Sequence, residues 1–336
     1  MGNIWDNITE NLIVTKTPLR VSFVGGGTDF YDYWNIFNGQ VISFSINKYI
    51  YTSLKRHSKF HNEKIRLNYS ENELVNNPNE LKNIVARGCL NYFNIETPLY
   101  IATVSDIPSG SGLGSSSSFM VGLVNAFFQS VNEPIGPGKL AYFANQIEIE
   151  YLKRPMGKQD AYPASYGGLN HLFFNKNGDT SITPIILEEN NFKILNSSLY
   201  LVSTNQIRDS SIVLENQSLN NKNNFNDDNL HLINALVDKF LNCLKYKFDL
   251  NEIGKILTET WEIKKKLSNL ISTSAIDKLF DKCIDSGAYG GKICGAGSGG
   301  FILCIVNPQN TENFTEKIKP NKYLKIEIDN LGSRRL

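Results

Sequence analysis

The feature of this sequence that most restricts its fold is a run of glycines and serines directly ahead of an apolar segment. Residues 108–118 read PSGSGLGSSSS, and the residues that follow carry apolar side chains at helical spacing. Glycines let backbone N–H groups turn toward one point, and serines at a helix start supply caps where the helix dipole favours anions. The run therefore predicts a phosphate-binding loop that opens a buried helix after Ser115.

A flexible Gly/Ser linker is the main alternative for this run. It fits less well, because a linker should not run directly into a strongly apolar helix. A Walker loop needs a lysine and then Ser or Thr after its last glycine, whereas Gly114 is followed by four serines. No Gly-x-Ser-x-Gly elbow is present either. The run is thus a phosphate loop of another kind.

Length and charge exclude several classes of function. A chain of 336 residues that is 41% hydrophobic can build a large core and two lobes. Its 34 basic and 33 acidic residues nearly cancel, so neither nucleic acid nor an anionic membrane is an expected partner. Residues 1–10 do not resemble a secretory signal and the apolar run 301–306 is too short to span a membrane, so we expect a cytoplasmic protein.

The cysteines and histidines give no clear metal or redox motif. The five cysteines form no C-x-x-C pair and are odd in number, which predicts reduced, mostly buried thiols. His57 and His61 lie four apart without an acidic or thiol partner at ligand spacing, so we interpret them as surface residues. His171 and His231 stand alone, and no catalytic histidine is expected.

The first half of the chain alternates strands with helices. Strands are predicted at 19–24, 41–45, 49–54, 64–68, 99–104 and 169–174. A second helix is predicted at 137–152, with Leu140, Ala144, Ile147 and Tyr151 on its apolar face. Residues 175–191 indicate a boundary loop or hairpin, which divides the chain into domains 1–192 and 193–336.

The second half contains strands at 198–203 and 301–306 and helices near 230–246, 250–267 and 276–286. Residues 216–229 are rich in asparagine and almost devoid of aliphatic side chains, which predicts an exposed or mobile stretch. Gly295, Gly297 and Gly300 satisfy a G-x-G-x-x-G pattern, but a strand follows where a dinucleotide fingerprint needs a helix. We expect a tight turn between paired strands, close to a ligand or to the first glycine loop.

A third glycine motif ends the first predicted strand. Residues 17–30 read TPLRVSFVGGGTDF, so the strand runs into three glycines and the carboxylate of Asp29. Strand ends of this kind commonly place polar groups in a cleft. Taken alone, Asp29 could equally cap the turn.

The three motifs in this order resemble those of the GHMP kinase superfamily, whose members transfer the γ-phosphoryl group of ATP to small molecules. The resemblance covers about residues 15–306. It implies an α+β fold with two lobes, an N-terminal mixed-sheet α/β lobe and a C-terminal ferredoxin-like lobe. Residues 25–30, 157–160, 259–265 and 332–334 resemble the bacterial D-glycero-D-manno-heptose 7-phosphate kinases more narrowly. That branch phosphorylates the anomeric hydroxyl of a sugar phosphate for surface polysaccharide.

The resemblance implies ATP and Mg²⁺ as cofactors. The ATP phosphates would lie against Gly110, Ser111, Gly112, Leu113, Gly114, Ser115 and Ser116. Ser116 and Glu148 match the Mg²⁺ ligands, although a one-residue slip would select Glu150, and both glutamates could be solvated helix charges.

The catalytic pair implied by the resemblance is Asp160 and Arg20. Asp160 would accept the proton of the sugar hydroxyl or orient that hydroxyl. Arg20 would pair with Asp160 and the γ-phosphate, and a nearby cation holds a carboxylate ionised. Because the transition state of phosphoryl transfer is loose, positioning and charge neutralisation matter most.

The acceptor side is the least defined. Asp29 would hold sugar hydroxyls, and Gly26 and Gly27 replace the Glu-His pair of galactose-specific members, which disfavours galactose and leaves room for a bulkier sugar. Lys158 and Arg208 are the first choices for the far-end phosphate, with Lys264 and Arg334 as alternatives, and the other interpretation is that all four are ordinary surface charges. The full predicted set is Gly26, Gly27, Thr28, Asp29, Lys158, Arg208 and Gly297.

Two other functions remain open at this point. One is a kinase of the same superfamily for another sugar, such as fucose, since Asn205 stands where the heptose branch usually has glycine. The other is a non-catalytic protein that binds RNA or a protein partner, against which the retained Arg20, Ser116, Glu148 and Asp160 argue. The expected partners are a small sugar phosphate and ATP, and a homodimer stays open.

Overall fold

The first lobe is organised around two long antiparallel strands, β1 (Ile13–Val24) and β2 (Gly39–Arg56), in a computed structural model that describes residues 4–58, 60–206, 210–223 and 225–336. The start of β2 pairs with β6 (Leu169–Phe174), and its end pairs with β5 (Leu99–Ser105). The sheet has the order β12-β1-β2-β5-β3-β4, with β7 beside β6. Its remaining strands are β3 (Ile65–Asn68), β4 (Asn72–Val75), β7 (Thr180–Pro184) and β12 (Arg334–Arg335).

Helix α3 (Ser115–Ser130) packs directly on this sheet. Gly122 allows the close approach, because a Cβ there would lie 2.8 Å from Thr17 Oγ1. Thr15 Oγ1 donates to the Gly122 carbonyl, and Ser118 Oγ donates to the Pro18 carbonyl. The other helices of the lobe are α1 (Tyr31–Phe37), α2 (Ile84–Tyr92), α4 (Pro137–Asn145) and α5 (Ala161–Tyr166), with short 3₁₀ helices at Ile4–Asn7 and Pro78–Glu80.

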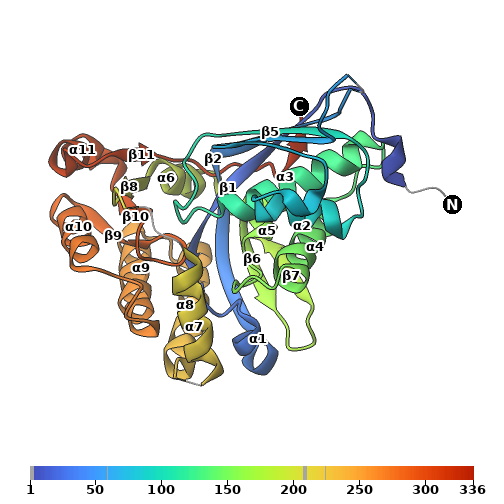
Figure 1. The fold of residues 1–336 in the computed structure, drawn as a ribbon. Helices are drawn as coiled ribbons and strands as arrows, with labels where there is room; N and C mark the ends of the chain where they lie inside the picture. Colours follow the sequence, from blue (N-terminus) through green and yellow to red (C-terminus); the bar gives the residue numbers. More distant parts are fainter. Residues whose placement is uncertain (1–3, 59, 207–209, 224) are drawn as a thin grey trace.

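The second lobe has a four-stranded antiparallel sheet in the order β11-β8-β10-β9 (Figure 1). These strands are β8 (Leu199–Ser203), β9 (Ala288–Ile293), β10 (Phe301–Val306) and β11 (Tyr323–Lys325). Its helices are α8 (Asp227–Tyr246), α9 (Leu250–Lys264), α10 (Ser274–Asp285) and α11 (Thr311–Ile318), preceded by α6 (Glu189–Ser197) and α7 (Ser210–Lys222). Short 3₁₀ helices span Lys265–Leu267 and Pro308–Asn310. The predicted fold class is confirmed.

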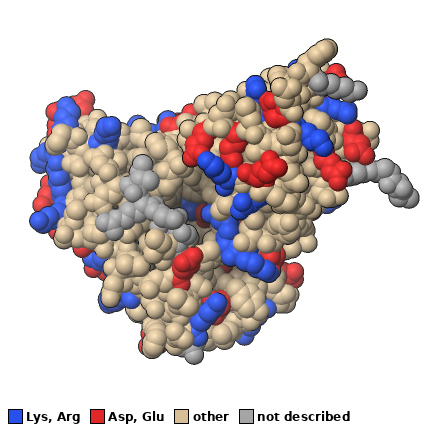
Figure 2. Space-filling model, viewed as in Figure 1, with Lys and Arg blue, Asp and Glu red and all other residues tan. Residues whose placement is uncertain are grey.

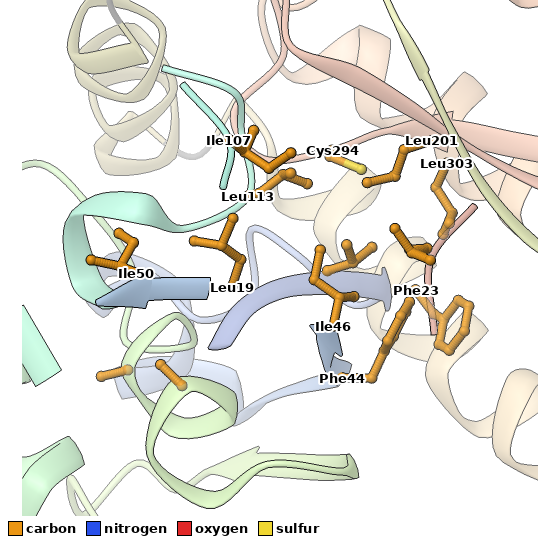
Figure 3. Close-up of a cluster of buried hydrophobic side chains, with 14 of the residues drawn as sticks. Leu19, Phe23, Phe44, Ile46, Ile50, Ile107, Leu113, Leu201, Cys294 and Leu303 are labelled. Carbon is orange, nitrogen blue, oxygen red and sulfur yellow. The ribbon is translucent and has the colours of Figure 1, made fainter. Parts of the chain in front are cut away.

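One hydrophobic core joins the two lobes. Leu19 and Phe23 of β1 face Leu201 of β8 and Leu303 of β10, with Leu113 and Cys294 between them (Figure 3). The last strand also crosses the expected division at residue 192, because β12 pairs with β1 in the first sheet. The shared core and the β12–β1 pairing therefore hold the two lobes together. These contacts fix the walls of any cleft between the lobes.

The Asn-rich stretch 216–229 was predicted to be exposed or mobile; several of its described residues are exposed, but the prediction was wrong for those that pack inward. It forms the end of α7 and the start of α8, with Gln217, Asn221 and Asn226 buried. Asn220 Nδ2 donates to the Leu267 carbonyl, and Ser268 Oγ donates to Asn216 Oδ1. Amide hydrogen bonds replace the aliphatic contacts that the composition lacks.

The predicted helix 137–152 changes its geometry partway along. After α4, residues Gln146–Tyr151 form a π-helix, a turn that is frequent at functional sites. The wider turn rotates the buried face, so Glu148 is fully buried while Tyr151, predicted to lie on the apolar face, is 49% exposed.

The interpretation of His57 as a surface residue was also wrong. Its ring is buried, stacks on the exposed His61 ring at 4.1 Å, and lies 3.3 Å from Glu63 Oε1, an acidic neighbour that the sequence analysis overlooked. All five cysteines are buried and unpaired, as predicted. Among the residues described, every helix is too short or too polar to cross a membrane.

Candidate active site

A cavity of about 890 Å³ opens between the two lobes. Figure 2 shows this face of the molecule hollowed between the lobes, with basic side chains at the edge. Both lobes line it: Arg20 and Asp160 come from the first, and Lys264, Gly295 and Ala296 come from the second. Its size lies within the range of small-molecule sites.

The two glycine-rich segments meet at one wall of this cavity. A Cβ on Gly295 would lie 2.6 Å from the Gly112 Cα, and one on Gly300 would lie 2.2 Å from the Ser111 carbonyl oxygen. The second segment joins β9 to β10, which is the predicted turn between paired strands beside the first loop. Gly114, with a φ of +72°, begins α3, so the loop opens a buried helix as expected.

Arg20 holds Asp160 at the centre of the cavity. The guanidinium makes two hydrogen bonds to the carboxylate, with Nε 2.7 Å from Oδ1 and Nη2 2.6 Å from Oδ2. Its Nη1 donates to the Gly112 carbonyl at 2.7 Å, and its backbone N–H donates to the Leu113 carbonyl. The pairing is a planar, bidentate one that fixes both groups against the first glycine loop.

Asp29 is buried beside this pair. Its carboxylate accepts the N–H groups of Gly27 at 2.9 Å and Gln159 at 3.2 Å. Gly157 is required here, because a Cβ would lie 1.9 Å from Asp29 Oδ2. Burial raises the pKa of the Asp29 carboxyl, while the two N–H groups oppose that rise. Residues 157–160 thus position both Asp29 and Asp160.

Ser116, at the start of α3, contacts the buried Glu148 of the π-helix. Ser116 Oγ donates to Glu148 Oε1 at 3.0 Å, and Arg154 Nη1 contacts both, at 2.5 Å from Ser116 Oγ. Burial raises the pKa of the Glu148 carboxyl, and the charge of Arg154 and the Ser116 hydrogen bond oppose that rise. A cationic group already lies against these two oxygens, so the site suits a cation. Glu150 instead pairs with Lys153 on the surface.

Several predicted substrate residues do not present side chains to the cavity. The ammonium of Lys158 donates to the Gly178 carbonyl at 3.0 Å and lies over the Trp34 ring. Thr28 Oγ1 is used by the turn, bonding to Gly25 and Gln40. Gly297 packs against Ile271. The Arg334 guanidinium donates to Asp329 and to the Leu331 carbonyl. Arg208 lies outside the described residues.

Three features of the cavity were not predicted from the sequence: Arg154, Gln217 and a group of apolar lining residues. These apolar residues are Tyr69, Val85, Ile107 and Phe119, which line the cavity together with the loop serines. Only Arg154 had a visible clue, since it directly precedes Pro155 at the predicted end of a helix. None of the four histidines is among the described lining residues.

Comparison with known proteins extends these observations. Residues 63–168 match the GHMP kinases N terminal domain, and residues 239–323 match the GHMP kinases C terminal domain. Over 316 residues the chain is 31% identical to D-glycero-alpha-D-manno-heptose 7-phosphate kinase of Campylobacter jejuni, covering 91% of this chain and 93% of the relative. Galactokinase of Pyrococcus furiosus is 25% identical, covering 91% and 92%.

Solved structures show the same architecture. D-glycero-D-manno-heptose 1-phosphate kinase from Bacteriodes thetaiotaomicron superposes with a TM-score of 0.77 at 26% identity, covering 96% of this chain and 98% of that one. Lactococcus lactis galactokinase, 16% identical, shares the fold with a TM-score of 0.75 over 98% of this chain and 96% of that one. The chain belongs to the GHMP kinase family. It is a phosphotransferase of the sugar kinase type, and kinases of this family use ATP, as predicted.

Proposed function

We propose that this enzyme uses ATP to phosphorylate the anomeric hydroxyl of D-glycero-D-manno-heptose 7-phosphate, giving the 1,7-bisphosphate. The observation that carries the proposal is the Arg20–Asp160 pair, which lies between the phosphate loop and the Asp29 turn in one cavity. The Campylobacter jejuni relative, named for this substrate, supports the choice of sugar. The Gly26–Gly27 step supports it as well, because both residues line the cavity without side chains.

The acceptor hydroxyl would lie between Asp160 and the γ-phosphate. As its oxygen forms a bond to the γ-phosphorus, the bond from that phosphorus to the β-phosphate oxygen breaks and ADP leaves. The proton of the hydroxyl passes to the Asp160 carboxylate, which Arg20 orients through two hydrogen bonds. Asp29, turned into the cavity by Gly27 and Gln159, would fix the sugar hydroxyls.

The nucleotide would occupy the opposite end. Backbone N–H groups of residues 110–116 and the start of α3 suit the phosphates, and the apolar side chains of Val85, Ile107 and Phe119 suit a base. Ser116 and Glu148 would hold Mg²⁺, whose charge offsets that of the phosphates. Arg154 would leave these two oxygens and become free to pair with phosphate.

A set of acceptors tests the proposal. Purified enzyme with ATP and Mg²⁺ is given heptose 7-phosphate, the same heptose without phosphate, fucose and galactose, and ADP release is measured. We expect the highest kcat/KM for heptose 7-phosphate, with the new phosphate at C1 by ³¹P NMR. Equal or faster turnover of fucose or of the unphosphorylated heptose would overturn the choice of substrate.

A further inference from the structure

Lys264 is a buried cation with little to neutralise it. It ends α9, is 7% exposed, and lines the cavity, where the charge of Asp29 acts on it. Its ammonium has three donors, and the one hydrogen bond found for it among the described residues goes to the Gly295 carbonyl. No carboxylate of the described residues lies within ion-pair distance of it. A buried charge without a partner is costly unless a ligand neutralises it.

The surroundings of Lys264 strengthen this excess of positive charge. Lys292, also buried, donates to the Ser22 carbonyl, and Arg20 is committed to Asp160. Burial and the neighbouring cations Lys292 and Arg20 lower the pKa of Lys264 to about 7, while Asp29 opposes the change. An anion brought into the cavity would interact favourably with this group of cations.

Gln217 supplies a second unpartnered donor in the same cavity. Its side chain is 2% exposed, and its Nε2 has no hydrogen-bond partner among the described residues. The amide is held close to the Asp29 turn, since a Cβ on Gly27 would lie 3.1 Å from Nε2. Leaving a buried donor unpaired costs on the order of 1–3 kcal/mol, so an acceptor atom is expected there.

We infer that Lys264 and Gln217, above the open floor of Gly26 and Gly27, form a subsite for a phosphate monoester carried by the acceptor. The inference rests on the proposed function and adds the residues that read the distal phosphate. Lys264 would give it a point charge and Gln217 a directed hydrogen bond. The glycines leave the volume that the far end of the sugar needs. Lys158, which bonds to Gly178, takes no part.

Binding measurements on variants test the subsite. K264M and Q217L are titrated calorimetrically with heptose 7-phosphate and with unphosphorylated heptose. K292M is the control, because Lys292 is also buried but is not among the described lining residues. We expect K264M to weaken binding of the phosphorylated sugar about thirtyfold and Q217L about fivefold, with less than threefold changes for the unphosphorylated sugar. K292M should keep the wild-type preference.

The outcomes separate the inference from the proposed function. If the wild type prefers the phosphorylated sugar and K264M keeps that preference, the subsite is wrong while the proposed substrate stands. If the wild type shows no preference, both are overturned. Loss of ATP affinity alone in K264M, measured by fluorescence titration, would place the lysine with the nucleotide and also overturn the subsite. We expect K264M to fold, because methionine is of similar length and removes a buried charge, and urea unfolding checks it.

Discussion

The two ends of the cavity differ in whether their buried charged and polar side chains have partners. Towards the proposed nucleotide end two buried carboxylates face cations: Glu148 contacts Arg154, and Asp160 contacts Arg20. At the acceptor end Lys264 and Gln217 keep donors without acceptors. The paired end is preorganised without ligand, whereas the unpaired end is completed only when an anion arrives. We therefore expect substitutions at the first to change catalysis and stability, and those at the second to change acceptor choice.

The largest effect is expected from Asp160→Asn. The amide keeps the shape and one oxygen acceptor but cannot take a proton, so kcat should fall by roughly 10²–10⁴ with ATP affinity retained. ADP release and nucleotide titration measure the two quantities. D329N serves as control, because Asp329 pairs with Arg334 away from the cavity. An unchanged kcat in D160N would remove Asp160 from the mechanism.

Arg154→Met is expected to have the next largest effect, on stability. Glu148 is fully buried, and losing its cationic partner leaves an unpaired carboxylate, so the free energy of unfolding without nucleotide should fall by about 3 kcal/mol. Urea unfolding measures it. Mg²⁺ with ATP should restore more stability to R154M than to the wild type, because the metal would supply the missing charge.

The matched control is Lys153→Met. Lys153 pairs with Glu150 at the surface, with side chains 75% and 58% exposed, so its loss should change the free energy of unfolding by less than about 0.5 kcal/mol. Wild-type stability in R154M would show that the nucleotide end does not depend on charge pairing.

What could be predicted from the sequence differs between local features of the chain and features that depend on tertiary packing. The glycine motifs gave the phosphate loop and the β9–β10 turn, because positive φ and close backbone approach are local demands on residue type. Asp160 and Glu148 were inferred from the resemblance; Asp160 lines the cavity, and Glu148 is buried behind it against Ser116 and Arg154, which do line it. Gln217 could not be found, since its burial depends on α7 packing near the Asp29 turn. Composition alone predicted an exposed or mobile stretch there, and tertiary hydrogen bonds bury part of it.

The kcat/KM for a phosphorylated acceptor should depend on pH, because the proposed subsite contains Lys264. Lys264 must be charged to bind an anion, so kcat/KM for a phosphorylated acceptor should fall above about pH 7, by up to ~tenfold per unit, toward the value of K264M. The value for an unphosphorylated acceptor should show no such fall. The groups whose charges act on Lys264 are Lys292, Cys294, Arg20 and Asp29.

The contribution of Lys264 to the free energy of unfolding should rise with pH, whereas kcat/KM for the phosphorylated acceptor should fall. The folded pKa of Lys264, about 7, lies below its ordinary value of 10.5, so the unfolded chain binds more protons between these values. The lysine's contribution to the free energy of unfolding therefore rises as pH rises through that window, and K264M should lack it. A wild-type kcat/KM that stays flat to pH 9 with a phosphorylated acceptor would contradict a charge-reading role.

The smallest effect is expected from Gly26→Ala. This variant tests whether the acceptor needs the space left by the missing side chains of Gly26 and Gly27. A Cβ at Gly26 would lie 3.5 Å from Gln159 Nε2 and 3.7 Å from Ser22 Oγ, ordinary contact distances, so unfolding should change by less than about 0.5 kcal/mol. Because the methyl group would enter the cavity, the acceptor KM should rise about threefold with the ATP KM unchanged. Gly27→Ala is the comparison variant.

At Gly27 φ is +109°, and a Cβ would meet Gln217 Nε2 and Leu230 at 3.1 Å. G27A should therefore lose about 1–3 kcal/mol of stability through backbone strain and also displace the amide that reads the phosphate. If the two glycines differ only in stability and neither changes the acceptor KM, the floor serves the turn rather than the substrate. A rise in the acceptor KM of G26A without a loss of stability would instead show that the glycines leave space for the acceptor.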